Sequence, residues 1–392
     1  MLVIDEAHCI SDWGHDFRLE YGNLNRFIKL LPQNVPLLAT TATANDRVIE
    51  DLKNQFGGDV FVSRGGLTRD SLAIQILNLN SRVDRYTWIL KNINKLKGTG
   101  IIYCLTQRDC DYLSDFLNKN GVNVLSYYSR KDEEPNSIAL NKFQNNQIKA
   151  IVATIKLGMG YDKGDIGFVI HFQQPSNIVS YYQQIGRAGR NIDRAEVFLM
   201  SGKENENIID YFIDTAFPTR EECEVIYSII DNNFGIGYRA IISKANFREN
   251  RINKTIYFLI NEGAIRKDGI KYYSTPNHYK YNQMHYNSVT EIRKKEKRQM
   301  YDLIKTKDCY SKFIANALDD FSAPNCNKCS NCLEQELMSS GLSLEEKEKA
   351  LEYLNNLSFE IEPRKRWATT SLTESNGDSV YKPKRYSFKQ IW

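Results

Sequence analysis

The segment Leu2-Val3-Ile4-Asp5-Glu6-Ala7-His8 places three apolar residues directly before two acids. A short apolar run of this kind is typical of a buried strand in a parallel sheet, and ligands bind where such strands end. Two adjacent carboxylates suit nucleotide hydrolysis, because one can hold Mg²⁺ while the other orients or deprotonates the attacking water. We therefore predict a site for ATP and Mg²⁺ at Asp5 and Glu6, with His8 in the same catalytic set. Taken alone, the two acids could instead be solvated residues at the end of a strand.

A second part of such a site is missing from the sequence. A phosphate-binding loop of the form Gly-x-x-x-x-Gly-Lys-Ser/Thr should come before this strand, and no Gly-Lys in the chain is followed by Ser or Thr. We therefore expect the chain to open inside an ATPase, with half of the nucleotide site absent.

Composition places the chain among soluble globular proteins. Its 392 residues allow about two to four domains, and 42% hydrophobic with 26% charged residues is ordinary for such proteins. The 52 basic and 48 acidic residues leave a net charge of only +4, so local patches must decide whether a partner is a polyanion. Asp5 and Glu6 interrupt the first apolar run, and no stretch reaches membrane-spanning length. We predict a cytoplasmic protein that does not bind membranes.

Strands and helices alternate beyond about residue 70. Apolar strands are predicted at Leu72–Leu77, Gly100–Cys104, Val122–Tyr127, Ala150–Ala153 and Phe168–His171. The helical patterns between them predict an α/β fold with a parallel sheet covered on both faces. Upstream, Pro36–Ala44 passes from a buried strand into a turn rich in threonine, and a helix should start near Asn45. A helix cap is the alternative role of these threonines.

The segment Gln183-Gln184-Ile185-Gly186-Arg187-Ala188-Gly189-Arg190 carries two arginines spaced by three, which we expect to share a helical face. Forked guanidinium groups can neutralise charge developing on a γ-phosphate, an effect worth roughly 10³ to 10⁵ in rate. We predict that Gln183, Arg187 and Arg190 belong to the catalytic set, with the arginines as fingers. Arginines on helices are otherwise solvated or salt-bridged.

The pattern changes after Phe217-Pro218. Three helical segments, at about 223–230, 238–244 and 248–261, precede a hairpin at 263–273 that carries Asp-Gly. This order predicts a winged helix. Basic residues suited to phosphate contact lie on the third helix and the wing, namely Arg248, Arg251, Lys254, Arg266, Lys267 and Lys271. Solvated faces and a protein-contact module are the alternatives.

Cys309 and the run Cys326-x-x-Cys329-x-x-Cys332 supply four thiols in one short region. Four thiolates are the number that a tetrahedral structural zinc requires, and polar residues between the last three favour a turn-rich knuckle. We predict a structural Zn²⁺ held by these four cysteines. We interpret Cys9, Cys104, Cys110 and Cys223 as small buried hydrophobic residues.

Taken together, these motifs resemble those of RecQ-family DNA helicases. The resemblance covers nearly the whole chain, from the aromatic-rich segment 5–18 through the motifs at 39–44, 104–108, 153–162 and 183–190 to Pro363-Arg364-Lys365-Arg366-Trp367. It implies RecA-like parallel-sheet lobes, the first one partial, followed by a winged-helix domain and a helical zinc-binding module. The predicted domains are 1–68 (first-lobe remnant), 69–205 (second lobe), 215–278 (winged helix), 285–336 (zinc module) and 340–392 (carboxyl-terminal extension or linker).

The resemblance also assigns roles to single residues. It implies a sensor that links contact with single-stranded DNA to hydrolysis, made of Trp13, His15, Phe17 and Arg18. Flat rings can stack on any base, and core packing is the alternative for the two aromatic residues. The resemblance further implies that Arg108 contacts the DNA backbone from a helix amino terminus. Gly160 and Asp162 would link DNA contact to the ribose side of the nucleotide.

Some features depart from the family pattern. Tyr161 stands where an aliphatic residue is usual, Gly164 replaces a proline, and Asn191-Ile192 replaces Asp-Gly. The predicted winged helix also precedes the zinc module, an order that some bacterial RecQ-like proteins share.

Two functions of different classes remain open. The first is a carboxyl-terminal segment of an ATP-dependent 3′ to 5′ DNA helicase that acts on single-stranded and forked DNA in repair or recombination. This helicase would need an amino-terminal segment that is separately encoded or missing. The second is a catalytically silent DNA-binding fragment, because nothing in the sequence can grip the β- and γ-phosphates.

Overall fold

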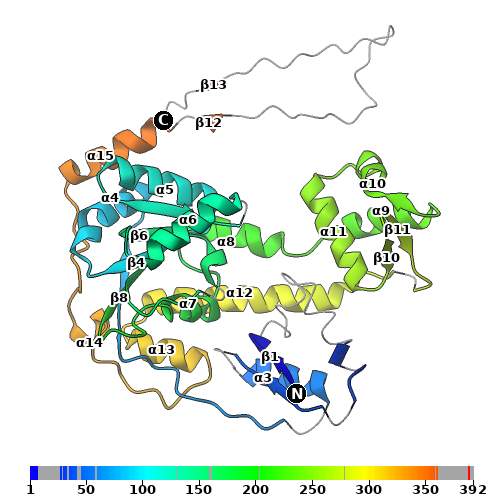
Figure 1. The fold of residues 1–392 in the computed structure, drawn as a ribbon, viewed down its shortest axis with the longest axis horizontal. Coiled ribbons are helices and arrows are strands. Elements are labelled where there is room, and N and C mark those ends of the chain that lie inside the picture. Colours follow the sequence, from blue (N-terminus) through cyan, green and yellow to red (C-terminus); the bar gives the residue numbers. More distant parts are fainter. Residues whose placement is uncertain are drawn as a thin grey trace.

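The computed structural model describes residues 1–7, 27–28, 30–32, 35–41, 46–57, 60–129, 131–158, 161–202, 204–277, 279–357, 359–360 and 387–388. A central α/β lobe carries a small amino-terminal unit, a winged-helix domain and a cysteine-rich module, and the long helix α12 runs between the last two (Figure 1). Within the described residues, no helix is both long and apolar enough to cross a membrane.

The amino-terminal unit contains the first predicted strand. β1 (Leu2–Ile4) pairs in parallel with β2 (Leu37–Ala39), and α3 (Asp46–Phe56) packs beside them. The buried side chains include Ile4, Val48 and Leu52. A core this small leaves the unit dependent on its neighbours for stability.

The central lobe is built on a six-stranded parallel sheet with the order β3-β8-β7-β4-β6-β5. Its strands are β3 (Leu72–Asn78), β4 (Thr99–Tyr103), β5 (Val124–Tyr127), β6 (Ala150–Ala153), β7 (Ile166–His171) and β8 (Ala195–Ser201). All five predicted strands are present, with ends shifted by at most two residues. β8 was not predicted. The parallel-sheet fold class is confirmed.

Helices cover both faces of this sheet, so its strands are buried on both sides. One face packs against α4 (Arg82–Asn92), α5 (Gln107–Lys119) and α15 (Leu344–Asn355). The other packs against α6 (Glu133–Gln144), α7 (Ile178–Ile185), α12 (Gln283–Lys305) and α13 (Tyr310–Ala317). The neighbours Ile101 and Ile102 illustrate the strand period, because they point into opposite cores.

The predicted carboxyl-terminal extension or linker, 340–392, contains helix α15. A capping box at Ser343 and Glu346 starts the helix, and the helix packs on α4 (Figure 1). Trp88 Nε1 donates to Ser339 O at 2.9 Å, and Tyr353 Oη donates to Asp115 Oδ2 at 2.8 Å. These contacts join α15 and the segment before it to the lobe.

The winged-helix domain has its own core and the predicted order of elements. The order is α9 (Arg220–Asp231), β9 (Ile236–Gly237), α10 (Tyr238–Lys244), α11 (Glu249–Asn261), β10 (Ile265–Asp268) and β11 (Lys271–Ser274). The strands form an antiparallel sheet in the order β10-β11-β9. Three helices with a two-stranded wing therefore follow the lobe, joined to it through α8 (Glu204–Asp214).

The basic run 293–298 lies on α12. Lys294, Lys295 and Arg298 are exposed, but Arg293 is half-buried, with its guanidinium 5.1 Å from the centroid of the Phe217 ring. Arg293 is therefore a packing residue between α12 and the winged helix. The remaining short elements are η2 (Ile93–Lys95), η3 (Ile155–Gly158), α14 (Ser330–Leu333), β12 (Phe359–Glu360) and β13 (Ser387–Phe388).

Candidate functional site

The predicted acid pair lies at the carboxyl end of β1, beside Thr40, which directly follows β2. Thr40 Oγ1 donates to Asp5 Oδ1 at 2.9 Å, and Ala7 N donates to Thr40 O at 2.9 Å. Glu6 has a φ of 51°, in the left-handed region that residues other than glycine rarely adopt. Such backbone strain is concentrated at functional sites, where surrounding contacts maintain it. Two sequence motifs about 35 residues apart thus meet at one sheet edge.

A cavity of about 600 Å³ brings this edge together with the arginine motif. Its charged lining residues are Glu6, Arg64, Arg69, Arg187, Arg190, Asp319 and Asp320. Glu6 and Thr41 come from the amino-terminal unit, Gln183 and the last two arginines from the segment after β7, and the aspartates from the cysteine-rich module. Four guanidinium groups in one cavity suit a polyanionic ligand.

The arginines do not share a helical face, which corrects one prediction. Helix α7 ends at Ile185, and residues 186–190 form a turn. Gly189 has a φ of 67°, and an added Cβ there would lie 2.4 Å from Ser71 Oγ. Ser71 Oγ donates to Gly189 O at 2.7 Å, which holds the turn against the start of β3. Glycine is therefore required both for the left-handed conformation and for the close approach.

The two arginines have different environments. Arg187 is buried, and its Nη1 donates to Tyr161 O at 2.7 Å. Arg190 is partly exposed, and its Nη1 lies 2.5 Å from Asp162 Oδ1. Surface ion pairs of this kind contribute about 0 to 1 kcal/mol, so Arg190 can exchange Asp162 for a phosphate at low cost. Asp162, predicted on the ribose side, is thus the partner of an expected finger.

Two departures from the family pattern contact one another. Asn191 N donates to Gly164 O at 2.9 Å, and a Cβ on Gly164 would lie 2.2 Å from Asn191 Nδ2. A proline at 164 would clash with the asparagine, so the two changes compensate. Tyr161 is accommodated as well, because its hydroxyl donates to Gln144 Oε1 at 2.9 Å.

The remaining charged groups of the cavity were not found from the sequence. Asp319 Oδ2 accepts from Asp46 N at 2.8 Å, at the first turn of α3, and Asp320 Oδ2 accepts from Leu67 N at 2.9 Å. Arg69 Nη1 donates to Gly186 O, and burial followed by the nearby Arg190 lowers its pKa. These residues follow no motif spacing, so no local signal could have identified them.

Several predicted site residues lie outside the described residues: His8, Trp13, His15, Phe17, Arg18 and Gly160. The predicted DNA-contacting residues Arg108, Arg248, Arg266 and Lys267 are all exposed. Arg108 lies in the first turn of α5. On the wing, the Arg266 guanidinium stacks 4.7 Å from the centroid of the Tyr273 ring. Basic groups beside aromatic rings provide both phosphate contact and a stacking surface.

Arg251 was predicted to contact DNA, but in the structure it is bound to other groups of the protein. Its guanidinium pairs with Glu222 and donates to Thr215 O at 3.0 Å and to Phe217 O at 3.1 Å. Burial would raise the pKa of Glu222, but hydrogen bonds from Arg251 and Thr219 hold it below its ordinary value. A half-buried arginine with these partners joins α11 to α9 and is not available to a phosphate.

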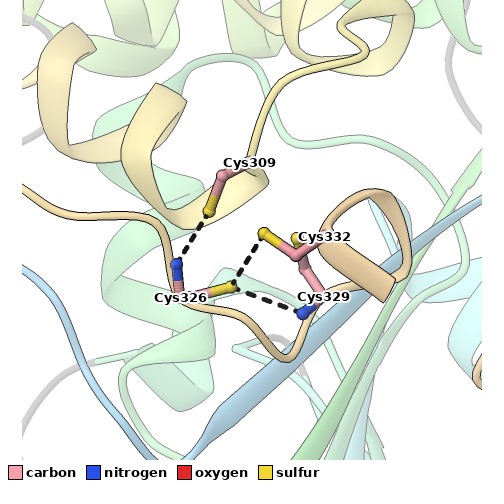
Figure 2. Close-up of side chains that lie close together, drawn as sticks. All are labelled: Cys309, Cys326, Cys329 and Cys332. Atoms are coloured by element: carbon pink, nitrogen blue, oxygen red, sulfur yellow. Dashed lines mark hydrogen bonds between the residues drawn. The ribbon is translucent and has the colours of Figure 1, made fainter. Parts of the chain in front are cut away.

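The four predicted cysteines form one cluster (Figure 2). The sulfur atoms of Cys309, Cys326, Cys329 and Cys332 all lie within 4.8 Å of one another. Cys326 N donates to Cys309 Sγ at 3.2 Å, and Cys329 N donates to Cys326 Sγ at 3.3 Å. A tetrahedral zinc with Zn–S bonds of about 2.3 Å needs sulfurs about 3.8 Å apart, which requires only a small contraction. The donor set therefore fits a closed metal site.

Comparison with known proteins agrees with this geometry. Residues 84–192 match the family model described as helicase conserved C-terminal domain. The "Putative ATP-dependent DNA helicase Q1" of Caenorhabditis briggsae is 42% identical over 195 residues, which are 49% of this chain and 31% of that protein. The "RecQ-like DNA helicase BLM" of Xenopus laevis is 39% identical over 204 residues, 50% of this chain and 15% of that protein.

A bacterial relative extends the match. The "Probable ATP-dependent DNA helicase RecS" of Bacillus subtilis is 31% identical over 233 residues, 59% of this chain and 47% of that protein. The chain spans less than half the length of each of these relatives. Residues 84–192, which contain the arginine turn and the strands β4 to β7, form a helicase conserved C-terminal domain. Over about half of its length the chain is similar to RecQ-type DNA helicases.

Proposed function

We propose that this chain provides the carboxyl-terminal part of an ATP-dependent DNA helicase that acts on single-stranded and forked DNA. The observation that supports the proposal is the shared cavity, which Glu6 lines together with Arg187 and Arg190. A motor that couples hydrolysis to movement needs acid and guanidinium groups at one nucleotide, contributed by parts of the chain that can move relative to each other.

Within this proposal each side chain has a role. Asp5 would hold Mg²⁺, which would neutralise phosphate charge. Glu6 would orient the attacking water. Arg190 would release Asp162 to contact the γ-phosphate, while Arg187 stays anchored to the Tyr161 carbonyl. In the absence of nucleotide, Asp162 would be the partner of the Arg190 guanidinium.

DNA contact would involve the basic residues that remain exposed. Arg108 faces solvent at the amino end of α5, where the helix dipole also favours a phosphate. Arg248, Arg266 and Lys267 lie on the winged helix, and the wing adds the Tyr273 ring as a stacking surface. Contacts of this kind bind backbone phosphates without reading sequence, which suits a helicase.

We propose a structural zinc for the cysteine cluster. Four thiolates leave no open coordination position, so the metal would stabilise the fold and take no part in catalysis. The backbone N–H donors at Cys326 and Cys329 would stabilise the thiolates.

Nucleotide binding tests the proposal directly. The affinity of the chain for a fluorescent methylanthraniloyl derivative of ATP with Mg²⁺ is measured for Arg190→Ala and for the control Arg194→Ala, whose exposed side chain pairs with Glu196. Arg190→Ala should lose about tenfold, the value of one charge-assisted contact, and the control should bind as the parent does. Equal affinities of the two variants would contradict the nucleotide site.

The catalytically silent DNA-binding protein is a second candidate, because the sequence contains no phosphate-binding loop. We expect no DNA-stimulated ATP hydrolysis by the 392-residue chain alone, together with DNA binding that weakens steeply as salt rises. Robust ATP hydrolysis by this chain alone would refute the view that hydrolysis requires the phosphate-binding loop. DNA-stimulated turnover after addition of an amino-terminal segment carrying such a loop would favour the helicase.

A further inference from the structure

A second cavity, of about 380 Å³, lies between the central lobe and the winged helix. Helix α7 contributes to both cavities. Its Tyr182 and Gln183 line the first cavity, whereas Ser180 and Gln184 line the second. The other walls come from β4, η3, the segment 173–177, α8, α11 and α12. Neither the acid pair nor the arginine turn lines this second cavity.

The walls of this cavity are mainly apolar. They include Ile155, Pro175, Ile209, Phe212, Ile213 and Ala216. Ile155 is 62% exposed and Phe212 is 47% exposed, so apolar surface faces solvent at the cavity. Cavities of this size with apolar walls and a few polar groups are the usual form of small-molecule sites. Covering this surface would be favourable through the hydrophobic effect.

Three charged residues belong to the lining: Lys254, Arg293 and Glu296. Two cations and one carboxylate leave a formal charge of +1. Lys254 Nζ donates to Thr215 O at 2.9 Å, one hydrogen bond from a group that has three donors. Burial lowers the pKa of Lys254 to about 8, and the neighbouring Arg251 acts in the same direction.

The other two charges are engaged with the protein. Burial lowers the pKa of Arg293 to about 10, opposed by Glu296, and its guanidinium lies over Phe217. Glu296 Oε2 accepts from Asn177 Nδ2 at 3.4 Å. Lys254 is thus the group with donors to spare beside an apolar cavity. Leaving an ammonium in this position is unfavourable, and an anion beside it would offset that cost.

We propose that this cavity binds a small apolar molecule that carries one anionic group, with the anion at Lys254 and the apolar body against Ile213 and Phe212. A single net positive charge matches a monoanion and not a nucleoside triphosphate. A DNA backbone would need a row of exposed cations, whereas this lining has one basic group with donors to spare, Lys254. The site is independent of the proposed nucleotide and DNA contacts.

The test uses two dyes with the same ring system. Anilinonaphthalene sulfonate carries one sulfonate, and N-phenylnaphthylamine is its neutral counterpart. Binding of each to the full chain is followed by fluorescence titration. Lys254→Met should weaken binding of the sulfonate about tenfold, as expected for one charge-assisted contact, and leave the neutral dye unchanged. Lys254→Arg, which keeps the charge, should retain sulfonate binding.

Matched variants identify the cavity. Lys244→Met removes an exposed lysine of α10 and should bind both dyes as the parent does. Ile155→Asp, at an exposed lining position, should weaken both dyes, and circular dichroism verifies that each variant is folded. Equal sulfonate affinity in Lys254→Met and the parent would overturn the proposal. Displacement of the sulfonate by a single-stranded oligonucleotide would also overturn it, because the cavity would then belong to the DNA path.

Discussion

Replacing Arg251 by Met should lower the free energy of local unfolding of the winged helix. The affinity of the folded protein for DNA should not change. The substitution removes the ion pair with Glu222 and the hydrogen bonds to Thr215 O and Phe217 O. Glu222 is only 7% exposed, so its carboxylate would be left buried without its charge partner. Removing one partner of a buried pair costs about 3 to 5 kcal/mol, and the exposure of Arg251 places the expected loss near the lower figure, about 3 kcal/mol.

Amide hydrogen exchange measures this loss locally in the full chain. A loss of about 3 kcal/mol in opening free energy corresponds to exchange on the order of a hundredfold faster for the amides of α9 and α11. Arg248→Ala, which removes an exposed arginine at the start of the same helix, should leave these rates unchanged. Unchanged protection of α11 in Arg251→Met would refute the structural role given to this arginine.

Other outcomes are expected for the wing, the cysteine cluster, the arginine turn and pH. The double variant Arg266→Ala with Lys267→Ala should weaken DNA binding and reduce the salt slope of the binding constant by about 2, measured by fluorescence anisotropy; an unchanged slope would remove the wing from the interface. Metal analysis should find zinc in the parent chain and none after Cys329→Ser, and zinc retained in that variant would contradict the four-cysteine site. Gly189→Ala should destabilise the lobe by at least about 1 kcal/mol in thermal unfolding, because alanine disfavours a φ of 67° and its Cβ would meet Ser71. The ordinary pKa of Glu222 is 4.5 and folding lowers it, so the winged helix should keep the full contribution of this pair above about pH 4.5 and lose it as the pH falls further; Glu222→Gln should remove that pH dependence of exchange.

The order of the folded units could be predicted because each has a local signature. Strands buried on both faces appear as continuous apolar runs, and this is why five strands of the parallel sheet were found within two residues of their observed ends. The Asp-Gly turn of the wing and the two-residue spacing of the cysteines are equally local.

The predictions that needed correction depended on contacts between distant residues. Arg248 and Arg251 look equivalent in sequence, but only Arg251 meets Glu222, which lies 29 residues away on another helix. The helical face assumed for Arg187 and Arg190 failed because Gly189 takes a left-handed conformation against Ser71.

The sequence by itself determined the RecA-like and winged-helix elements, the candidate acids and arginines, and the four cysteines, since periodicity and motif spacing act over a few residues. Only the tertiary structure decided which residues line the same cavity. It brought Glu6, Arg69, Arg190 and Asp320 together, although they lie up to about 300 residues apart, and it left Lys254 beside an apolar space. The physical reason is that burial and charge pairing depend on the packing of whole elements, which no local pattern encodes.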